Sequence, residues 1–218
     1  RQVASLPRDQ LPDAVRTQLA AGIAEYLAAQ TFNAERPEAQ VNIGGLYADL
    51  SRWGEAEAAY RTALRLQPDF LPAYLNLAQL LSDRGRETEA EGLLLSGLER
   101  QPRAAALSHA LGLSLVRQQR LDEALPRLAD AASQGPDEGR YAYVYAVALQ
   151  SAGRLDEALR VLDQAAARHP QDTEILLALT TFHRDAGHRA EALGYARKLQ
   201  ALAPGNATAD ALVRELKP

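Results

Sequence analysis

The sequence RYAYVYAVAL, residues 140–149, decides between two folds. Tyr141, Tyr143 and Tyr145 alternate with smaller residues, which is typical of a half-buried β-strand. The chain continues into LQSAGRLDEALRVLDQAAARHP (149–170), where apolar residues recur at the three- and four-residue spacing of a helix. The stretch is therefore either a strand before a helix or the first half of a helical hairpin.

An internal repeat of 34 residues resolves this ambiguity. Prolines and alanines recur at this interval without insertion or deletion: Pro68, Pro102, Pro136, Pro170 and Pro204, and Ala56, Ala90, Ala124, Ala158 and Ala192. Two further columns recur at the same interval. One holds large apolar residues, Ile43, Leu77, Leu111, Tyr145 and Leu179, and the other holds small residues, Gly44, Ala78, Gly112, Ala146 and Thr180. RYAYVYAVAL shares these columns with PAYLNLAQLL (72–81) and ALSHALGLSL (106–115), so we predict a first helix, with Tyr145 in the core.

Each unit contains two helical patterns joined by a short turn. Gly85, Gly153 and Gly187 mark that turn in three units, where glycine takes a positive φ without steric cost. The recurring proline ends the second helix, and the small columns let two helix backbones approach closely. Pro126 departs from the pattern, and we expect a kink or a late helix start there.

These columns, together with Trp53 and Tyr60, resemble the tetratricopeptide repeat family over residues 37–204. The resemblance implies an all-α fold: a right-handed α-solenoid of five helix hairpins whose first helices line a concave groove. The expected repeats are 37–70, 71–104, 105–138, 139–172 and 173–204. We expect residues 1–36 to form an N-terminal helical cap or degenerate repeat, because Tyr26 aligns with Tyr60, and residues 205–218 to form a C-terminal capping helix, with Asn206 or Thr208 as its N-cap.

The resemblance also implies a binding surface for proteins or peptides. The predicted groove residues are Val41, Asn42, Leu75, Asn76, Gln79, His109, Leu113, Tyr143, Val147, Leu177 and Thr181. Family members often use asparagines such as Asn42 and Asn76 to bond a ligand's backbone amides. Some members clamp a terminal carboxylate with lysine and arginine, but here those columns hold Glu38, Val41, Gly45, Pro72 and Leu75. The groove therefore suits an apolar peptide, a partner helix or a neighbouring domain. The alternative is a scaffold in which these side chains pack on one another.

Composition argues against several other functions. The net charge of −4 and the pI near 5.6 disfavour general binding of nucleic acid. No stretch approaches the roughly 18 apolar residues of a membrane span. The absence of cysteine removes disulfides, thiolate metal sites and covalent haem attachment from this chain.

We also expect no enzyme, no metal site and no cofactor in this chain. The histidines are His109, His169, His183 and His188, and none belongs to a His-Glu-x-x-His pattern. His183 and His188 are five residues apart across a helix end, a poor spacing for one metal-binding face. No phosphate-binding glycine loop or nucleophile motif is present.

A narrower resemblance concerns the parent protein. The stretches AEYLAAQTFNAERPEAQVNIGGLYA (24–48), HALGLSLVRQQRLDEAL (109–125) and GRYAYVYAVALQSAGR (139–154) are similar to C-terminal repeat arrays of bacterial multihaem c-type cytochromes. This resemblance implies haem in an upstream domain, and a role in docking that domain, a redox partner or a second copy of the array. It implies the periplasm; the other expectation is the bacterial cytoplasm. The sequence contains no methionine, from which we expect a fragment of a longer protein.

Overall fold

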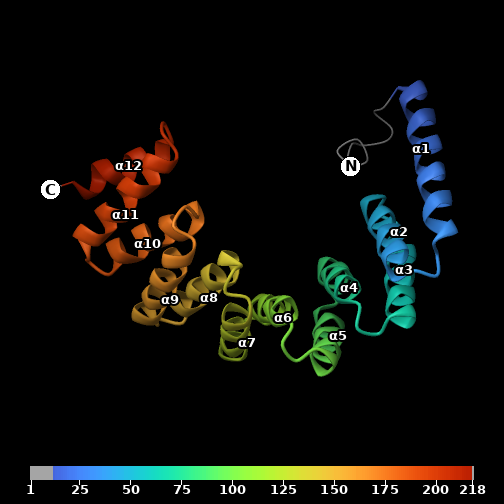
Figure 1. Cartoon of the computed structure of the whole chain (residues 1–218), viewed down its shortest axis with the longest axis horizontal. Helices are drawn as coiled ribbons and strands as arrows, with labels where there is room; N and C mark the ends of the chain where they lie inside the picture. The colour runs from blue at the N-terminus through green and yellow to red at the C-terminus, as the bar shows by residue number, and fades with distance from the viewer. Residues whose placement is uncertain (1–11, 218) are drawn as a thin grey trace. The chain divides into compact units, whose positions relative to one another are not determined.

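The computed structural model describes residues 12–217, which form twelve α-helices and no β-strand (Figure 1). The helices are α1 (Asp13–Phe32), α2 (Pro37–Asp49), α3 (Trp53–Leu66), α4 (Leu71–Asp83), α5 (Glu87–Arg100), α6 (Ala105–Arg117), α7 (Leu121–Gln134), α8 (Gly139–Ser151), α9 (Leu155–Arg168), α10 (Thr173–Asp185), α11 (Arg189–Leu202) and α12 (Ala207–Leu216). RYAYVYAVAL lies within α8, so the helical prediction is confirmed and the strand alternative is wrong. None of the helices in this described part is long and apolar enough to cross a membrane.

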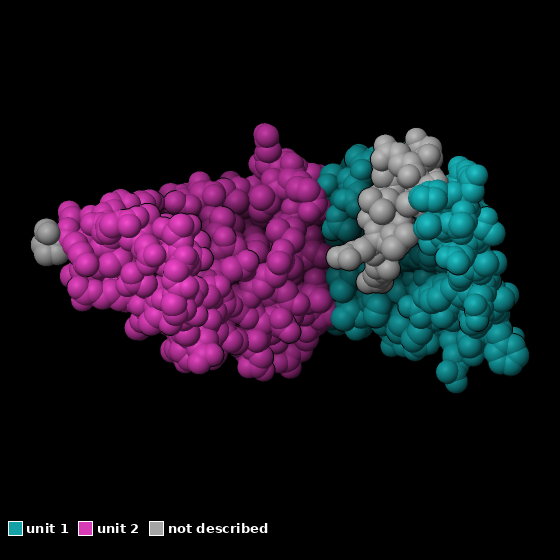
Figure 2. Space-filling view, turned by 90° about the horizontal axis from the view of Figure 1, so that it is seen from above, with its two compact units in different colours: residues 1–102 teal, residues 103–218 magenta. Residues whose placement is uncertain are grey.

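The chain divides into two compact units, Arg1–Pro102 and Arg103–Pro218 (Figure 2). In the first unit α2 packs on α3, α4 packs on α5, and α1 contacts α2. In the second unit the hairpins are α6 with α7, α8 with α9, and α10 with α11, and α12 packs on α11. First helices of successive hairpins also touch, α2 with α4 and α8 with α10, as expected for hairpins stacked side by side.

Every hairpin has the same turn between its two helices. Gly85, Gly153 and Gly187 have φ values of 72°, 75° and 80°, which confirms the predicted left-handed glycines. The other two turns place Ser51 (φ 58°) and Gln119 (φ 60°) in the same conformation. In all five turns, the residue after the one with positive φ donates its N–H to the carbonyl oxygen five residues before it, at 2.8 or 2.9 Å. This is the Schellman hydrogen bond that ends a helix.

The recurrent small residues lie where the helices of a hairpin touch. All five repeat alanines, from Ala56 to Ala192, have no exposed surface. Gly44 lies against the ring of Tyr60, and Gly112 lies against Leu128. A Cβ at position 112 would lie 2.5 Å from Leu128 Cδ2 and 2.7 Å from its Cγ, closer than carbon atoms approach. The missing side chain is therefore a condition for this helix contact.

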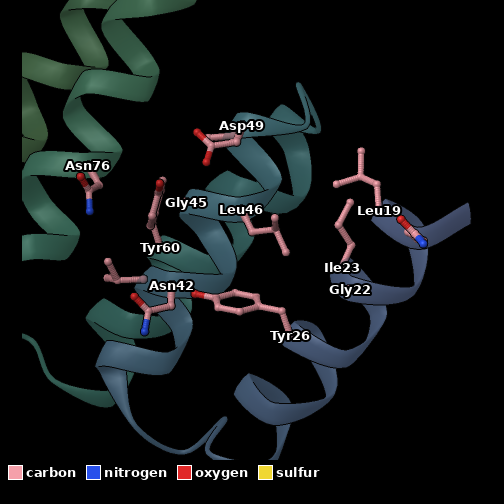
Figure 3. A pocket seen from close by; sticks show the side chains of 13 residues that line it. Leu19, Gly22, Ile23, Tyr26, Asn42, Gly45, Leu46, Asp49, Tyr60 and Asn76 are labelled. Atoms are coloured by element: carbon pink, nitrogen blue, oxygen red, sulfur yellow. The ribbon is translucent and has the colours of Figure 1, made fainter. Parts of the chain in front are cut away.

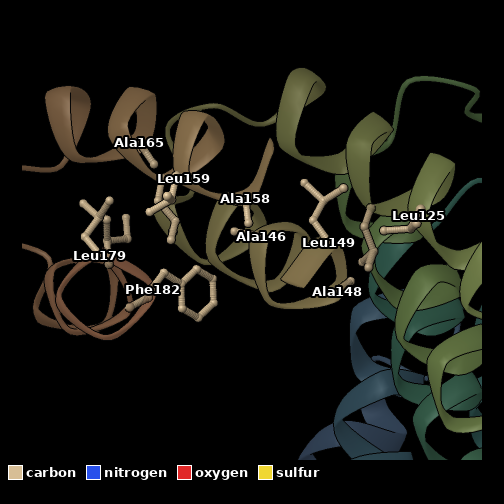
Figure 4. Packing of buried hydrophobic residues seen from close by; sticks show 13 residues of the cluster. Leu125, Ala146, Ala148, Leu149, Ala158, Leu159, Ala165, Leu179 and Phe182 are labelled. Atoms are coloured by element: carbon tan, nitrogen blue, oxygen red, sulfur yellow. The ribbon is translucent and has the colours of Figure 1, made fainter. Parts of the chain in front are cut away.

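The core of the second unit is built from the apolar columns. Its main cluster joins α7, α8, α9 and α10 and includes Leu149, Leu162 and Leu179, all fully buried (Figure 4). Tyr145 packs at the edge of this cluster and is only half-buried, so its predicted core position holds in part.

Two other local predictions can be compared with the structure. Pro126 lies inside α7, which begins at Leu121, so the predicted late helix start is wrong. Asn206 caps α12, because its side chain accepts hydrogen bonds from the N–H groups of Thr208 and Ala209 at 3.0 and 3.1 Å. Of the two candidate caps, Asn206 is confirmed.

A matched pair of glycine substitutions tests the close helix contact. Gly112→Ala should lower the free energy of unfolding by about 1–3 kcal/mol, because the added methyl group overpacks against Leu128. Gly194 is exposed in the middle of α11, and a methyl group added there meets no atom within 4 Å. Gly194→Ala should therefore raise the free energy of unfolding by about 0.5–1 kcal/mol. Urea unfolding followed by circular dichroism measures both. Equal effects of the two substitutions would contradict a packing role for Gly112.

Candidate functional site

A pocket of about 840 Å³ opens on the first unit between α1, α2 and α4 (Figure 3). Its volume lies in the range of about 300–1,000 Å³ that is usual for ligand-binding sites. It is lined by Gln18, Leu19, Gly22, Ile23, Tyr26, Val41, Asn42, Gly45, Leu46, Ala48, Asp49, Tyr60 and Asn76.

The wall that α1 contributes is an apolar stripe. Leu19, Ile23 and Tyr26 are spaced by four and three residues, which places them on one face of the helix. Tyr26 projects from α1 toward α2 (Figure 3). No residue of α1 is buried, so this face remains accessible although it lies opposite α2.

The opposite wall and the floor come from the first hairpin. Val41, Gly45 and Asp49 follow one another at intervals of four residues along α2, and Leu46 lies beside them. Tyr60 reaches this wall from α3 because Gly44 leaves space for its ring, and Tyr60 is only 4% exposed. The helix contact inside the hairpin therefore sets the depth of the pocket.

Two asparagine amides supply hydrogen-bonding groups. Asn42 Nδ2 donates to Gln30 Oε1 at 3.3 Å, which links α2 to α1. Within the described part of the chain, the Asn76 amide has no hydrogen-bond partner and is exposed. Asp49 is the one charged side chain among the thirteen that line the pocket. The described residues of the site thus offer apolar walls, two asparagine amides, of which that of Asn42 already bonds to Gln30, and a single negative charge.

The structure brings together three of the predicted groove residues, Val41, Asn42 and Asn76, in this pocket. Leu75 is half-buried on α4 and is not among the described residues that line the pocket, and Gln79 donates to Asp83 on its own helix at 2.6 Å. The remaining six lie in the second unit: His109, Leu113, Tyr143, Val147, Leu177 and Thr181. The role of all eleven in binding stays a prediction.

Sequence reasoning missed the α1 wall of the pocket. The alignment of Tyr26 with Tyr60 predicts a cap or degenerate repeat for residues 1–36 and no ligand contact for them. The spacing of Leu19, Ile23 and Tyr26 was the available signal, because an apolar stripe on an end helix needs a neighbour.

His109 is the one predicted groove residue that is buried, with 9% of its surface exposed. Its ring packs against Tyr141, with 4.7 Å between the ring centroids. Burial, with a smaller effect from Arg140, lowers the pKa of His109 to about 4. Its Nδ1 atom has no hydrogen-bond partner among the described residues. At neutral pH this imidazole is therefore uncharged and part of the packing.

No group of three or more histidine, aspartate or glutamate side chains within residues 12–217 is arranged to hold a metal ion. One close approach was not expected from the sequence spacing, and whether these residues bind a metal stays a prediction. His183 and His188 do come together, with 3.3 Å between their Nδ1 atoms. The turn between α10 and α11 brings the two rings close to each other in a way that helical spacing alone does not reveal.

The buried imidazole of His109 should make stability depend on pH. The unfolded chain takes up a proton near pH 6.5 and the folded chain near pH 4, so stability is full above pH 6.5 and falls as the pH drops toward 4. The loss between pH 7.5 and 4.5 should be about 2 kcal/mol larger in the wild type than in His109→Leu. Urea unfolding at the two pH values measures this difference. An identical loss in both proteins would show that His109 is solvated.

Comparison with known proteins agrees with this architecture. Sequence profiles of the tetratricopeptide repeat family match residues 13–69, 109–173 and 146–207, and a second profile of the same family matches residues 47–113. A search of curated protein sequences gave no match.

Solved structures with a similar fold cover most of the chain. YrrB, a TPR protein with an unusual peptide-binding site, superposes with a TM-score of 0.62 at 21% identity, over 87% of this chain and 97% of YrrB. PilF from Pseudomonas aeruginosa superposes with a TM-score of 0.68 at 19% identity, over 83% of this chain and 82% of PilF. TTC0263 from Thermus thermophilus superposes with a TM-score of 0.58 at 23% identity, over 83% of this chain and 98% of TTC0263. These similarities establish the fold, and with the profile matches they show that this chain belongs to the tetratricopeptide repeat family.

Proposed function

We propose that this chain is a non-catalytic protein-interaction module that binds an extended, apolar segment of another protein in the pocket of the first unit. Tetratricopeptide repeats are typical of such modules, and the similar structure YrrB has a peptide-binding site. The observation that carries the proposal is the pairing of apolar walls with the exposed amide of Asn76, which has no hydrogen-bond partner among the described residues, in one pocket.

The chemistry of the lining selects an extended segment. Leu19, Ile23 and Val41 can remove apolar side chains of a ligand from water, which stabilises a complex by about 25 cal/mol for each Å² buried. An extended backbone has unpaired N–H and C=O groups, and burying these without partners is unfavourable. The amides of Asn42 and Asn76 can both donate and accept hydrogen bonds, so they can satisfy such groups.

The charge of the pocket further limits which segments can bind. Asp49 repels acidic side chains and terminal carboxylates, and among the described residues that line the pocket there is no lysine or arginine to attract them. The ligand is therefore an internal segment, or one with a basic residue next to its apolar side chains. The same lining supports a non-catalytic role, because none of its thirteen residues is a serine, histidine, lysine or glutamate that could act as nucleophile or base beside Asp49.

A peptide library tests this assignment. The whole chain is used to select peptides from a random library, and the dissociation constant of an enriched peptide is measured by fluorescence anisotropy. Val41→Asp should weaken binding by more than about tenfold, because a second carboxylate is placed in the apolar wall of the pocket. The selected peptides should be apolar and poor in acidic residues.

Val116→Asp is the matched control, since Val116 is 39% exposed on α6 in the second unit and should leave affinity unchanged. Circular dichroism establishes that both variants keep their helices. Unchanged affinity of Val41→Asp, or selection of mainly acidic peptides, would remove the pocket as the binding site.

A further inference from the structure

The last of the five hairpin turns carries an unusual pair of residues. Two columns of the repeat, five residues apart, flank each turn. In the first four turns the earlier column holds Tyr47, Leu81, Leu115 or Leu149, and the later column always holds arginine: Arg52, Arg86, Arg120 and Arg154. In the fifth turn both columns hold histidine, at His183 and His188. This substitution replaces an apolar side chain and a cation by two metal-ligating groups in one place.

The fold brings these two columns together in every turn. The N–H of the later residue donates to the carbonyl oxygen of the earlier one, at 2.8 Å for Arg52 to Tyr47 and at 2.8 Å for His188 to His183. In the first turn the Arg52 guanidinium consequently lies over the Tyr47 ring, 4.4 Å from its centroid. The same backbone geometry places the rings of His183 and His188 with their centroids 5.5 Å apart and their Nδ1 atoms 3.3 Å apart.

This separation suits two ligands of one metal ion. Imidazole nitrogens bind zinc at about 2.0–2.1 Å with tetrahedral geometry, so two of them lie about 3.3–3.4 Å apart around the ion. The Nδ1 atoms already have this spacing before a metal arrives. Both rings would then carry their proton on Nε2, in place of the single Nδ1–H···Nδ1 hydrogen bond that a metal-free neutral pair can make.

The surroundings hold one ring in place and supply negative charge. The ring of Tyr195 stacks on His183 with a centroid distance of 5.6 Å and an angle of 13° between the planes. The Tyr195 hydroxyl donates to Asp163 Oδ1 at 2.8 Å, which fixes that stack. His183 is 8% exposed, whereas His188 is exposed, so an ion can approach from the side of His188.

Glu191 adds a carboxylate three residues after His188. In the other four repeats this column holds Glu55, Glu89, Glu123 and Glu157, each of which accepts hydrogen bonds from the turn arginine at 2.6–2.9 Å. In the fifth turn histidine replaces that arginine, so Glu191 lacks the partner that the other glutamates of its column have. A negative charge here favours a bound cation.

We propose that His183 and His188 form a binding site for a divalent transition-metal ion such as Zn²⁺, with both rings binding through Nδ1. Water completes the coordination, and Glu191 joins it after a change of side-chain rotamer. Because the described residues around the pair supply no third ligand in position, the ion is exchangeable and is not required for folding. The site lies in the second unit and is independent of the pocket in the first.

Isothermal titration of the whole, tag-free chain with ZnCl₂ tests this proposal. The wild type should bind one Zn²⁺ per chain. His188→Arg and His183→Leu restore the residues of the other repeats, so they should keep the fold while lowering zinc affinity by at least about tenfold each. His169→Gln, which removes a histidine from another turn, should leave affinity unchanged. Circular dichroism verifies the helix content of every variant.

Imidazole resonances in a parallel NMR titration locate the ion. Those of His183 and His188 should shift with zinc, and those of His109 and His169 should not. Absence of zinc binding by the wild type at millimolar concentration would overturn the proposal. Equal binding by the double variant His183→Leu/His188→Arg, or loss of binding in His169→Gln, would overturn it as well.

Discussion

The contact between the two helices of each hairpin is the constraint on which the other features depend. It requires a small residue wherever the backbones meet, and the column from Gly44 to Thr180 supplies one in every repeat. With Ala56 and its four equivalents fully buried, a side chain larger than alanine has no room at those positions. The two helices of each hairpin are thereby held in close contact, and the turn between them has the same conformation in all five hairpins. The residues that flank these turns, 34 apart in sequence, therefore occupy equivalent backbone positions.

Both candidate sites are consequences of that equivalence. In the first hairpin the close contact is made by Gly44 and Tyr60, so a tyrosine reaches the floor of the pocket. In the last hairpin the shared turn geometry brings together whatever residues occupy its two flanking columns, and these are His183 and His188. The positions that hold the hairpins together are thus alike in all repeats, and the histidine pair lies where one repeat departs from the others.

Much of the fold was predictable from sequence because it rests on local, repeated signals. The period, the helix pairs and the turn glycines Gly85, Gly153 and Gly187 need only spacing and backbone chemistry. The α1 wall of the pocket was not predictable in the same way, since it depends on how a helix outside the regular columns docks on α2. The burial of His109 likewise depends on Tyr141, which arrives from another hairpin. The distance between His183 and His188 depends on a non-helical turn, which helical periodicity does not describe.

Other predictions from the sequence concern features outside this chain or its local structure. The right-handed superhelix, the parent cytochrome with haem in an upstream domain, and the periplasmic location stay predictions. They do not enter the argument for the pocket, which needs only the first unit, or for the histidine pair, which needs only the last turn.

Hydrogen–deuterium exchange of the whole chain, with and without a peptide selected from the library, tests the central claim that the first hairpin and α1 form the recognition surface. The account predicts slower amide exchange in α1, α2 and α4 when the peptide is bound, and unchanged exchange in α8 to α11. Protection confined to the second unit, or spread evenly over all repeats, would contradict it.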